Sequence, residues 1–372
     1  MKKLGFGMMR MPLLTEGKPS DVDREQVKKM VDRFLEEGFT YFDTAWMYHA
    51  FQSEHVVKEV LVDRHPRESY TLADKLHHGF FNSLEDRDKV FEAQREKTGV
   101  SYFDYYLLHG IEDHSVEKYE KYDCFHWLRQ KKAEGLVRHI GFSFHGTPEL
   151  LERLLTENPD MEFVQLQLNY LDWESKGIRA HECYETAVRH GVPVIVMEPV
   201  KGGTLANVPE DVEKLFKDYD PQASAASWAI RFVASLPDVM VVLSGMSSLE
   251  QMEDNLSYMK EFKALEAEEY TRINQAVRMI NSNIQIPCTG CSYCTEGCPM
   301  NIPIPTYFAL YNADFQEVKG KSWLPQIAYY NNLTRTRGKA GDCIACGQCE
   351  GVCPQHLPII ELMEKVSAHY DK

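Results

Sequence analysis

The last quarter of the chain contains CTGCSYCTEGCP at residues 288–299 and CIACGQCEGVCP at residues 343–354. Both runs have the spacing C-x2-C-x2-C-x3-C-P. In this pattern three thiolates bind one iron–sulfur cube, and the fourth, which precedes proline, binds the other cube. The sequence therefore predicts two [4Fe–4S] clusters with crossed ligands. The expected ligands are Cys288, Cys291, Cys294 and Cys353 for the first cluster, and Cys343, Cys346, Cys349 and Cys298 for the second.

Zinc and disulfides are the two alternatives for these cysteines. A structural zinc site usually takes Cys or His ligands in pairs, and neither run has that arrangement. Disulfides need an oxidising compartment, and the start of the chain does not resemble a secretion signal. The spacing therefore favours iron–sulfur clusters. Because such clusters are oxygen-sensitive, the cytoplasm is the expected compartment.

The composition is that of a soluble globular protein. The chain has 372 residues, of which 44% are hydrophobic and 26% charged. Its net charge of −15 makes nucleic acid a poor partner. No apolar run is long enough for a membrane span. The two cysteines outside the motifs, Cys124 and Cys183, lie in apolar helical patterns and are expected to be buried, inert thiols.

Strand-like and helix-like segments alternate eight times before the cysteine runs. This alternation predicts a closed (β/α)8 TIM barrel. A doubly wound open sheet is the alternative, but the Gly-rich fingerprint expected after its first strand is missing. The predicted strands are residues 5–10, 40–45, 70–76, 102–110, 137–146, 163–169, 192–199 and 239–246. The predicted helices are residues 24–38, 53–63, 83–99, 117–135, 148–158, 181–191, 223–236 and 248–259.

The predicted domains are a barrel at residues 1–265, a connecting helix at 266–286 and a cluster domain at 287–372. The interval between the two cysteine runs is longer than in compact two-cluster ferredoxins and has helical character. The cluster domain is therefore expected to be a small α-helical ferredoxin-like domain. Its predicted helices are residues 305–315, 323–333 and 358–370.

Four polar residues, Asp43, Tyr48, Lys75 and His109, lie at or just after the ends of predicted strands, where a TIM barrel carries its chemistry. A tyrosine has an ordinary pKa of about 10, and a neighbouring ammonium lowers it. A carboxylate can hold that ammonium, and an imidazole can orient a carbonyl oxygen. Together the four could protonate a carbonyl as hydride reaches its carbon. Taken singly, each residue could instead be structural, as a helix cap, a rim aromatic, a solvated lysine or a core histidine.

The order of these four residues resembles the catalytic quartet of the aldo-keto reductases. The resemblance implies that Tyr48 is the general acid/base and that the other three assist it. It covers nearly all of residues 1–260, and the whole chain resembles a branch of the family with a C-terminal two-cluster ferredoxin. Further similar segments are GFGMMRMP (5–12), SEHVVKEVL (53–61), GFSFHG (141–146), Gln165, EPVKGG (198–203) and SGMSSLEQMEDN (244–255).

The loops after the seventh and eighth strands are expected to bind the phosphates of a dinucleotide. Lys201, Gly202 and Gly203 suit a pyrophosphate, because glycines allow close backbone approach and the lysine carries charge. A plain surface turn is the alternative. The loop after the eighth strand resembles the family's adenosine-binding segment. The other candidate cofactor-binding residues are Ser143, Gln165, Ser244, Gly245, Ser247, Gln251, Asp254 and Asn255.

Residues 239–259 contain no Lys or Arg, whereas NADPH-dependent members of the family bind the 2′-phosphate there with basic side chains. A phosphate without a cation is poorly held, so NAD(H) is expected over NADP(H). Two other positions depart from the family: Met197 replaces the aromatic that stacks on nicotinamide, and Phe144 replaces an Asn of the carboxamide site. Glu198 is expected to pair with Lys201. FMN is a further possible cofactor, at the same phosphate site.

The leading hypothesis is an oxidoreductase that interconverts a small carbonyl compound and its alcohol. Its clusters would exchange electrons with a flavin, the substrate or an external redox carrier protein. One alternative is a flavin- or radical-dependent barrel enzyme acting on another bond. Another is an electron-transfer subunit whose barrel is a scaffold, and the clusters could also be purely structural. The short loops predict an open barrel mouth, with substrate contacts supplied by residues 300–342.

Overall fold

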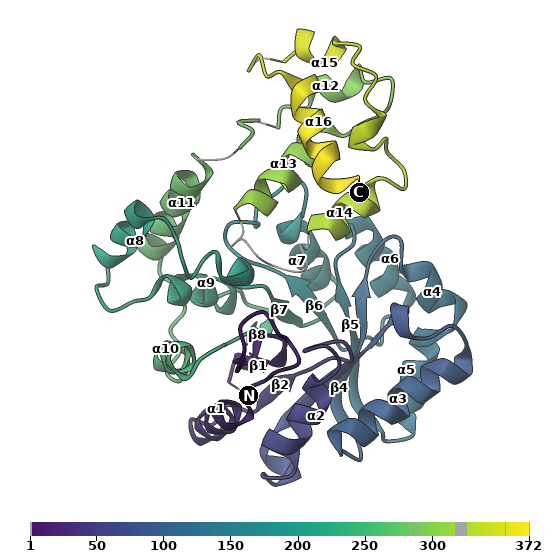
Figure 1. Cartoon of the computed structure of the whole chain (residues 1–372), viewed down its shortest axis with the longest axis vertical. Coiled ribbons are helices and arrows are strands. Elements are labelled where there is room, and N and C mark those ends of the chain that lie inside the picture. Colours follow the sequence, from purple (N-terminus) through teal and green to yellow (C-terminus); the bar gives the residue numbers. More distant parts are fainter. Residues whose placement is uncertain (1, 283–284, 289, 317–325, 354, 372) are drawn as a thin grey trace.

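The computed structural model describes residues 2–282, 285–288, 290–316, 326–353 and 355–371. The N-terminal part is a closed barrel of eight parallel strands in sequence order, and β1 pairs with β8 to complete it (Figure 1). This confirms the predicted (β/α)8 fold. The strands are β1 (Leu4–Gly7), β2 (Tyr41–Asp43), β3 (Thr71–His77), β4 (Phe103–Ile111), β5 (Val137–Phe144), β6 (Phe163–Gln167), β7 (Val194–Met197) and β8 (Val239–Ser244).

Helices surround this barrel and begin and end largely where the sequence signals predict. The helix that follows Ser83, for example, is capped by the Ser83 hydroxyl and ends at Gly99, whose φ is 74°. The predicted helix 117–135 is broken at Asp123, where φ is 51°, and the helix at 210–217 was not predicted. The helices are α1 (Arg24–Glu36), α2 (Ser53–Val57), α3 (Leu84–Thr98), α4 (Val116–Lys121), α5 (Cys124–Ala133), α6 (Pro148–Glu157), α7 (Ala180–Arg189), α8 (Glu210–Lys217), α9 (Ala225–Ala234), α10 (Leu249–Met259) and α11 (Ala267–Asn281).

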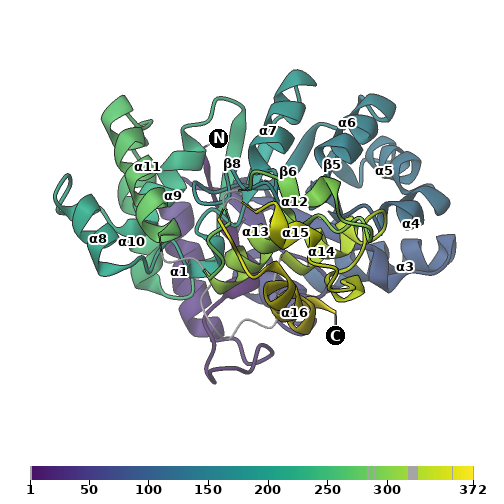
Figure 2. The same ribbon diagram turned by 90° about the horizontal axis from the view of Figure 1, so that it is seen from above.

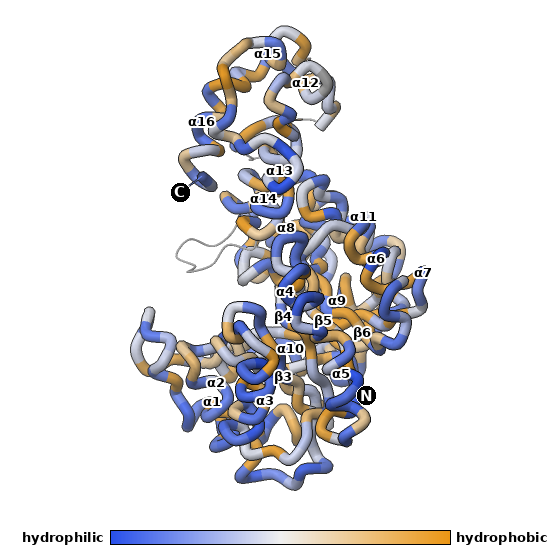
Figure 3. Tube along the Cα trace, turned by 90° about the vertical axis from the view of Figure 1, so that its right-hand side faces the viewer, coloured by the Kyte–Doolittle hydropathy of each residue, from blue (hydrophilic) through white to orange (hydrophobic). Residues whose placement is uncertain are grey.

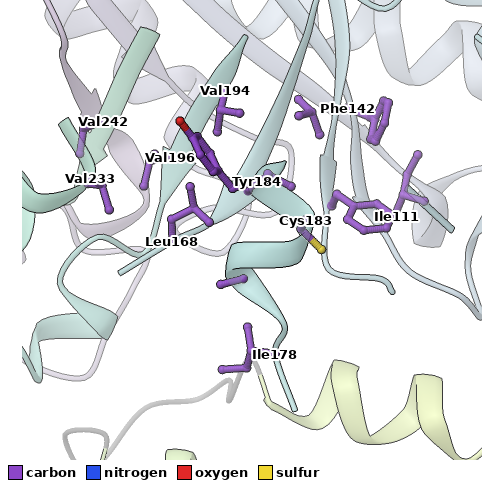
Figure 4. Close-up of a cluster of buried hydrophobic side chains, with 14 of the residues drawn as sticks. Ile111, Phe142, Leu168, Ile178, Cys183, Tyr184, Val194, Val196, Val233 and Val242 are labelled. Atoms are coloured by element: carbon purple, nitrogen blue, oxygen red, sulfur yellow. The ribbon is translucent and has the colours of Figure 1, made fainter. Parts of the chain in front are cut away.

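Apolar side chains fill two regions of the barrel domain. Tyr41, Leu107, Phe163 and Val241 belong to a cluster inside the barrel, to which β2, β3, β4, β6, β7 and β8 contribute. A larger core lies between the strands and the surrounding helices, and Figure 4 shows part of it around β6, β7 and α7. The barrel is therefore closed inside by side chains, so its chemistry must take place at its mouth.

Cys124 and Cys183 are buried in the outer core, as predicted. Burial raises the pKa of each thiol to about 12. Both thiols are therefore protonated at neutral pH, which makes them poor nucleophiles.

The C-terminal domain consists of short helices that extend the molecule beyond the barrel (Figure 3). Residues 323–325 of the predicted helix 323–333, and Thr289 and Pro354 of the two motifs, lie outside the described residues. Helix α11 is fastened to α9 by an ion pair of 2.7 Å between Arg231 and Glu269. The C-terminal helices are α12 (Tyr293–Glu296), α13 (Ile304–Phe315), α14 (Gln326–Leu333), α15 (Gln348–Gly351) and α16 (Ile359–Tyr370).

Seen from above, the C-terminal helices lie over the barrel (Figure 2). Asn332 of α14 accepts a hydrogen bond from the Asp113 amide at 3.1 Å and donates one to the His145 carbonyl at 2.9 Å. Nearby, Arg335 pairs with Glu117 at 2.6 Å. These contacts hold α14 against the loops after β4 and β5, at the end of the barrel that carries function. Within the described ranges, no helix has the length and apolar character of a membrane span.

Candidate active site and cysteine cavities

Asp43, Tyr48, Lys75 and His109 lie together at the carboxyl ends of β2, β3 and β4. The buried Lys75 Nζ is 2.5 Å from Asp43 Oδ1 and 2.7 Å from the Thr44 carbonyl oxygen. The same Nζ is 3.4 Å from the Tyr48 hydroxyl. The Tyr48 ring lies edge-on to His109, with 5.9 Å between ring centroids. The structure thus brings the four predicted residues into one site, while their catalytic roles remain predictions.

Burial is the largest influence on the Tyr48 hydroxyl. It raises the pKa of Tyr48, and the Lys75 ammonium offsets only part of this rise. This corrects the expectation that Lys75 lowers the pKa of Tyr48 overall, because removing the phenolate from water costs more than the ammonium returns. Burial also opposes charge on Lys75, but Asp43 and Tyr48 raise the pKa of Lys75 overall. Tyr48 is therefore a neutral phenol beside a charged ammonium at neutral pH.

The imidazole of His109 is neutral. Burial, together with the Lys75 charge, places the pKa of His109 well below its ordinary range. A neutral imidazole has one donor and one acceptor nitrogen. His109 Nδ1 is buried and has no hydrogen-bond partner in the described part of the chain. The ring is therefore suited to hydrogen bonding with a neutral polar group, such as a carbonyl oxygen.

The turn after Tyr48 has an unusual backbone. Residues 49–51 have φ angles of 52°, 52° and 68°, although none of them is glycine. Residues with a Cβ are strained in this left-handed region, and the two ring nitrogens of His49 compensate with hydrogen bonds to backbone groups of the loop after β1. The turn presents Phe51, which is 45% exposed, edge-on to Phe80 at 5.7 Å. It therefore gives the site an aromatic rim.

Ser143 and Gln165 are neighbours on β5 and β6. Ser143 Oγ accepts a hydrogen bond of 2.7 Å from the Gly110 amide. Gln165 Nε2 is 3.5 Å from Met197 Sδ, and Gln165 Oε1 is buried with no partner among the described residues. A nicotinamide carboxamide offers the N–H groups that this oxygen lacks. The pair therefore fits the predicted nicotinamide site.

The placement of Lys201 argues against its predicted role in binding phosphate. Lys201 Nζ lies 2.7 Å from Asp172 Oδ1, and both side chains are almost fully buried. The lysine charge is therefore offset by a buried carboxylate. Gly202 and Gly203 follow in a tight turn with φ of 61° and 105°, so their backbone still allows the close approach that was predicted.

Most predicted adenosine-binding residues, which lie between the end of β8 and the first turns of α10, bond to each other. Asn255 Nδ2 donates to Ser244 Oγ at 2.7 Å. The Ser247 amide donates to Gln251 Oε1, also at 2.7 Å. Asp254 instead accepts a hydrogen bond from a serine hydroxyl before α9. This segment is therefore held by its own contacts, whereas Asp254 is bonded to Ser224.

Arg10 is a cation at the mouth that the sequence analysis missed. Its side chain lies against Gly245, where an added Cβ would be 3.0 Å from Arg10 Cδ. Its guanidinium is 3.5 Å from Glu198, which was expected to pair with Lys201. Arg10 follows β1, so inspection of every strand end would have identified it. The cofactor prediction considered only the cations of residues 239–259, and Arg10 lies outside that segment.

The eight motif cysteines line two separate cavities in the C-terminal domain. Ile304 and Ile359 line both cavities, so the two share an apolar wall. Four thiols around each cavity are the donor set that a [4Fe–4S] cluster requires, and their grouping is the one predicted from the spacing. The first cysteine cavity is lined by Cys288, Cys291, Cys294 and Cys353. The second cysteine cavity is lined by Cys298, Cys343, Cys346 and Cys349.

Family comparisons agree with both parts of this description. Residues 3–278 match the aldo/keto reductase family, and residues 287–357 match a 4Fe-4S dicluster domain. The protein is therefore an oxidoreductase that belongs to the aldo/keto reductase family. Its C-terminal part is an iron–sulfur domain of the dicluster type.

Individual relatives are distant. The uncharacterized oxidoreductase YqkF of Bacillus subtilis is 23% identical over 266 residues, which cover 63% of this chain and 82% of that protein. The L-galactose dehydrogenase of Arabidopsis thaliana is 24% identical over 254 residues, which cover 63% of this chain and 78% of that protein.

Solved structures support the barrel. The holo form of aldo-keto reductase AKR11C1 from Bacillus halodurans has a TM-score of 0.57 and 25% identity, and the match covers 74% of this chain and 91% of that one. An aldo-keto reductase from Klebsiella pneumoniae, solved in complex with NADPH, has a TM-score of 0.57 and 21% identity. That match covers 73% of this chain and 90% of the other and shows the shared fold.

Proposed function

We propose that this protein interconverts a small carbonyl compound and its alcohol at the mouth of the barrel. The observation that carries the proposal is the contact chain from Asp43 through Lys75 to Tyr48, beside the neutral ring of His109. This set can give a proton to an oxygen and orient it at the same time. A nicotinamide dinucleotide bound beside Gln165 would supply the hydride.

In the proposed reduction, Tyr48 donates its proton to the carbonyl oxygen. Its raised pKa keeps the hydroxyl protonated until that step. The Lys75 ammonium stabilises the phenolate that is left, and Asp43 holds the ammonium in position. His109 donates a hydrogen bond to the same carbonyl oxygen and thereby orients it. Aromatic side chains such as Phe51 would contact the rest of the substrate.

The two cysteine sets are proposed to hold two [4Fe–4S] clusters, which supply single electrons when bound. A hydride carries two electrons, whereas a cluster carries one. A cluster therefore needs a partner that exchanges single electrons. The partner that we expect for the C-terminal domain is an external redox carrier protein.

Anaerobically purified protein provides the direct test. It is incubated with NADH or NADPH and a panel of small aldehydes, and the loss of reduced dinucleotide is compared with the alcohol formed. We expect the two quantities to be equal. Failure to reduce any aldehyde with either dinucleotide would contradict the proposal, and bound FMN would favour the alternative flavin enzyme.

NADH is expected to bind at least as tightly as NADPH. Residues 239–259 offer only neutral donors such as Ser247 and Gln251 for a ribose, and the nearby cation Arg10 contacts Glu198. Replacing Gln251 by Arg should shift the preference toward NADPH by ~1.5–3 kcal/mol, the usual strength of a charge-assisted hydrogen bond. Titration of the anaerobic protein with both dinucleotides measures the preference.

A matched control is Gln130→Arg, which adds the same charge at an exposed position of α5 and should leave the preference unchanged. The contrary result is a wild-type preference for NADPH, the dinucleotide found in the Klebsiella pneumoniae structure. The 2′-phosphate would then have to meet Arg10, and Arg10→Ala should abolish that preference.

A further inference from the structure

Lys176 joins the barrel to the first cysteine cavity. This residue lies in the loop between β6 and α7, and its ammonium donates a hydrogen bond to the carbonyl oxygen of Gly290, between Cys288 and Cys291. Gly290 has a φ of 69°, and a Cβ added there would lie 3.0 Å from Lys176 Nζ. The lysine therefore runs along the backbone of the first cysteine run, where it places a positive charge beside the ligands.

A carboxylate lies beside the second cysteine cavity. Glu350 follows Cys349 directly in α15 and is half-buried. Its Oε1 accepts a hydrogen bond of 2.9 Å from the amide of Ile360, a residue that lines the second cavity. Among the side chains that the structure describes, an ammonium therefore lies beside the first cysteine set and a carboxylate beside the second.

This difference affects the energy of adding an electron. Reduction of a cluster adds one negative charge, and the surrounding net charge is one of the factors that set its reduction potential. A nearby cation stabilises the reduced form, whereas a nearby anion destabilises it. Lys176 is exposed, so part of its effect is screened by salt. Glu350 is half-buried and should be screened less.

We propose that Lys176 raises the reduction potential of the cluster at the first cysteine cavity above that of the cluster beside Glu350. The inference rests on the proposed assignment of two clusters. With this order of potentials, the second cluster gives up one electron and is thereby oxidised. The first cluster accepts that electron and is thereby reduced. The electron is thereby delivered to the side of the C-terminal domain that contacts the barrel through Lys176.

Anaerobic redox titration of the whole chain, followed by electron paramagnetic resonance, tests this order. The wild type should show two one-electron transitions at different potentials. Lys176→Met should lower the reduction potential of the higher-potential cluster by ~59 mV, which is a tenfold change in the equilibrium constant of a one-electron couple. Glu350→Gln should instead raise the lower potential. Lys176→Arg keeps the charge and should resemble the wild type.

Lys214→Met is the matched control, because it removes an exposed lysine from α8 on the barrel; it should move neither transition. Iron content is measured first for every variant. A wild type with fewer than two clusters refutes the cluster assignment itself. Full iron content with unchanged potentials in Lys176→Met, or a shift of the lower transition, refutes only the role of Lys176.

Loss of iron in Lys176→Met would leave the wild type and Lys176→Arg as the test proteins. In each of these two proteins, the potentials of the two clusters should approach each other as the salt concentration rises, because salt screens the exposed positive charge at position 176. A separation that does not depend on salt in either protein would overturn the proposal.

Discussion

Replacing Tyr48 with phenylalanine is expected to lower the rate of carbonyl reduction by about 10²-fold or more, the usual contribution of general acid catalysis. The change removes the hydroxyl that lies 3.4 Å from Lys75 Nζ but keeps the ring that packs against His109. Substrate binding should therefore change little, and the loss should appear in kcat rather than in KM. Steady-state kinetics with an aldehyde measure both constants.

The pH dependence of the wild type should report the same hydroxyl. Burial raises the pKa of Tyr48 against the opposing effect of Lys75. Because a general acid must be protonated, reduction should be constant through neutral pH and fall as the pH rises through this raised pKa. Oxidation of the alcohol requires the deprotonated form and should rise over the same range. Tyr48→Phe should lose both dependences.

Tyr219→Phe is a suitable control, because it removes a tyrosine hydroxyl near α8 and α9, away from the four site residues. It should leave both constants and the pH profile unchanged. Full turnover in Tyr48→Phe would mean that the barrel performs different chemistry. That result would favour the alternative of a flavin- or radical-dependent enzyme.

The sequence alone was sufficient to predict the barrel and the proximity of its four candidate catalytic residues. Alternating strand and helix patterns place Asp43 and His109 at the ends of parallel strands, and a closed barrel brings such ends together. The pairing of Lys201 with Asp172 could not be predicted in this way. It depends on how the loops after β6 and β7 pack against each other, which no local pattern records.

The C-terminal domain shows the same division between local and distant information. Cysteine spacing is a local property, and it was sufficient to predict how the thiols group around the two cavities. The docking of α14 depends instead on the contacts of Asn332 with Asp113 and with the carbonyl of His145. A single Asn in a short helix has no sequence signal for such a partner.

The largest change in iron content is expected when one of the crossed cluster ligands is replaced. The anaerobic wild type should contain about eight irons and show a broad brown absorbance that dithionite bleaches. Cys298 belongs to the first motif in sequence but lines the second cavity with Cys343, Cys346 and Cys349. Cys298→Ala should therefore reduce the iron content toward about four by loss of the second cluster.

Two matched variants make this result specific. Cys353→Ala should cause the opposite loss, because Cys353 lines the first cavity although it belongs to the second motif. Cys183→Ala removes a buried thiol of the barrel and should leave all the iron in place. Cluster identity is read from the electron paramagnetic resonance signal that persists in each variant. Cys291→Ala removes a ligand of the first cavity and so identifies the signal of the second cluster. Identical residual signals in Cys298→Ala and Cys291→Ala would show that the fourth ligands do not cross, and four irons or fewer in the reconstituted wild type, or stoichiometric zinc, would exclude two clusters.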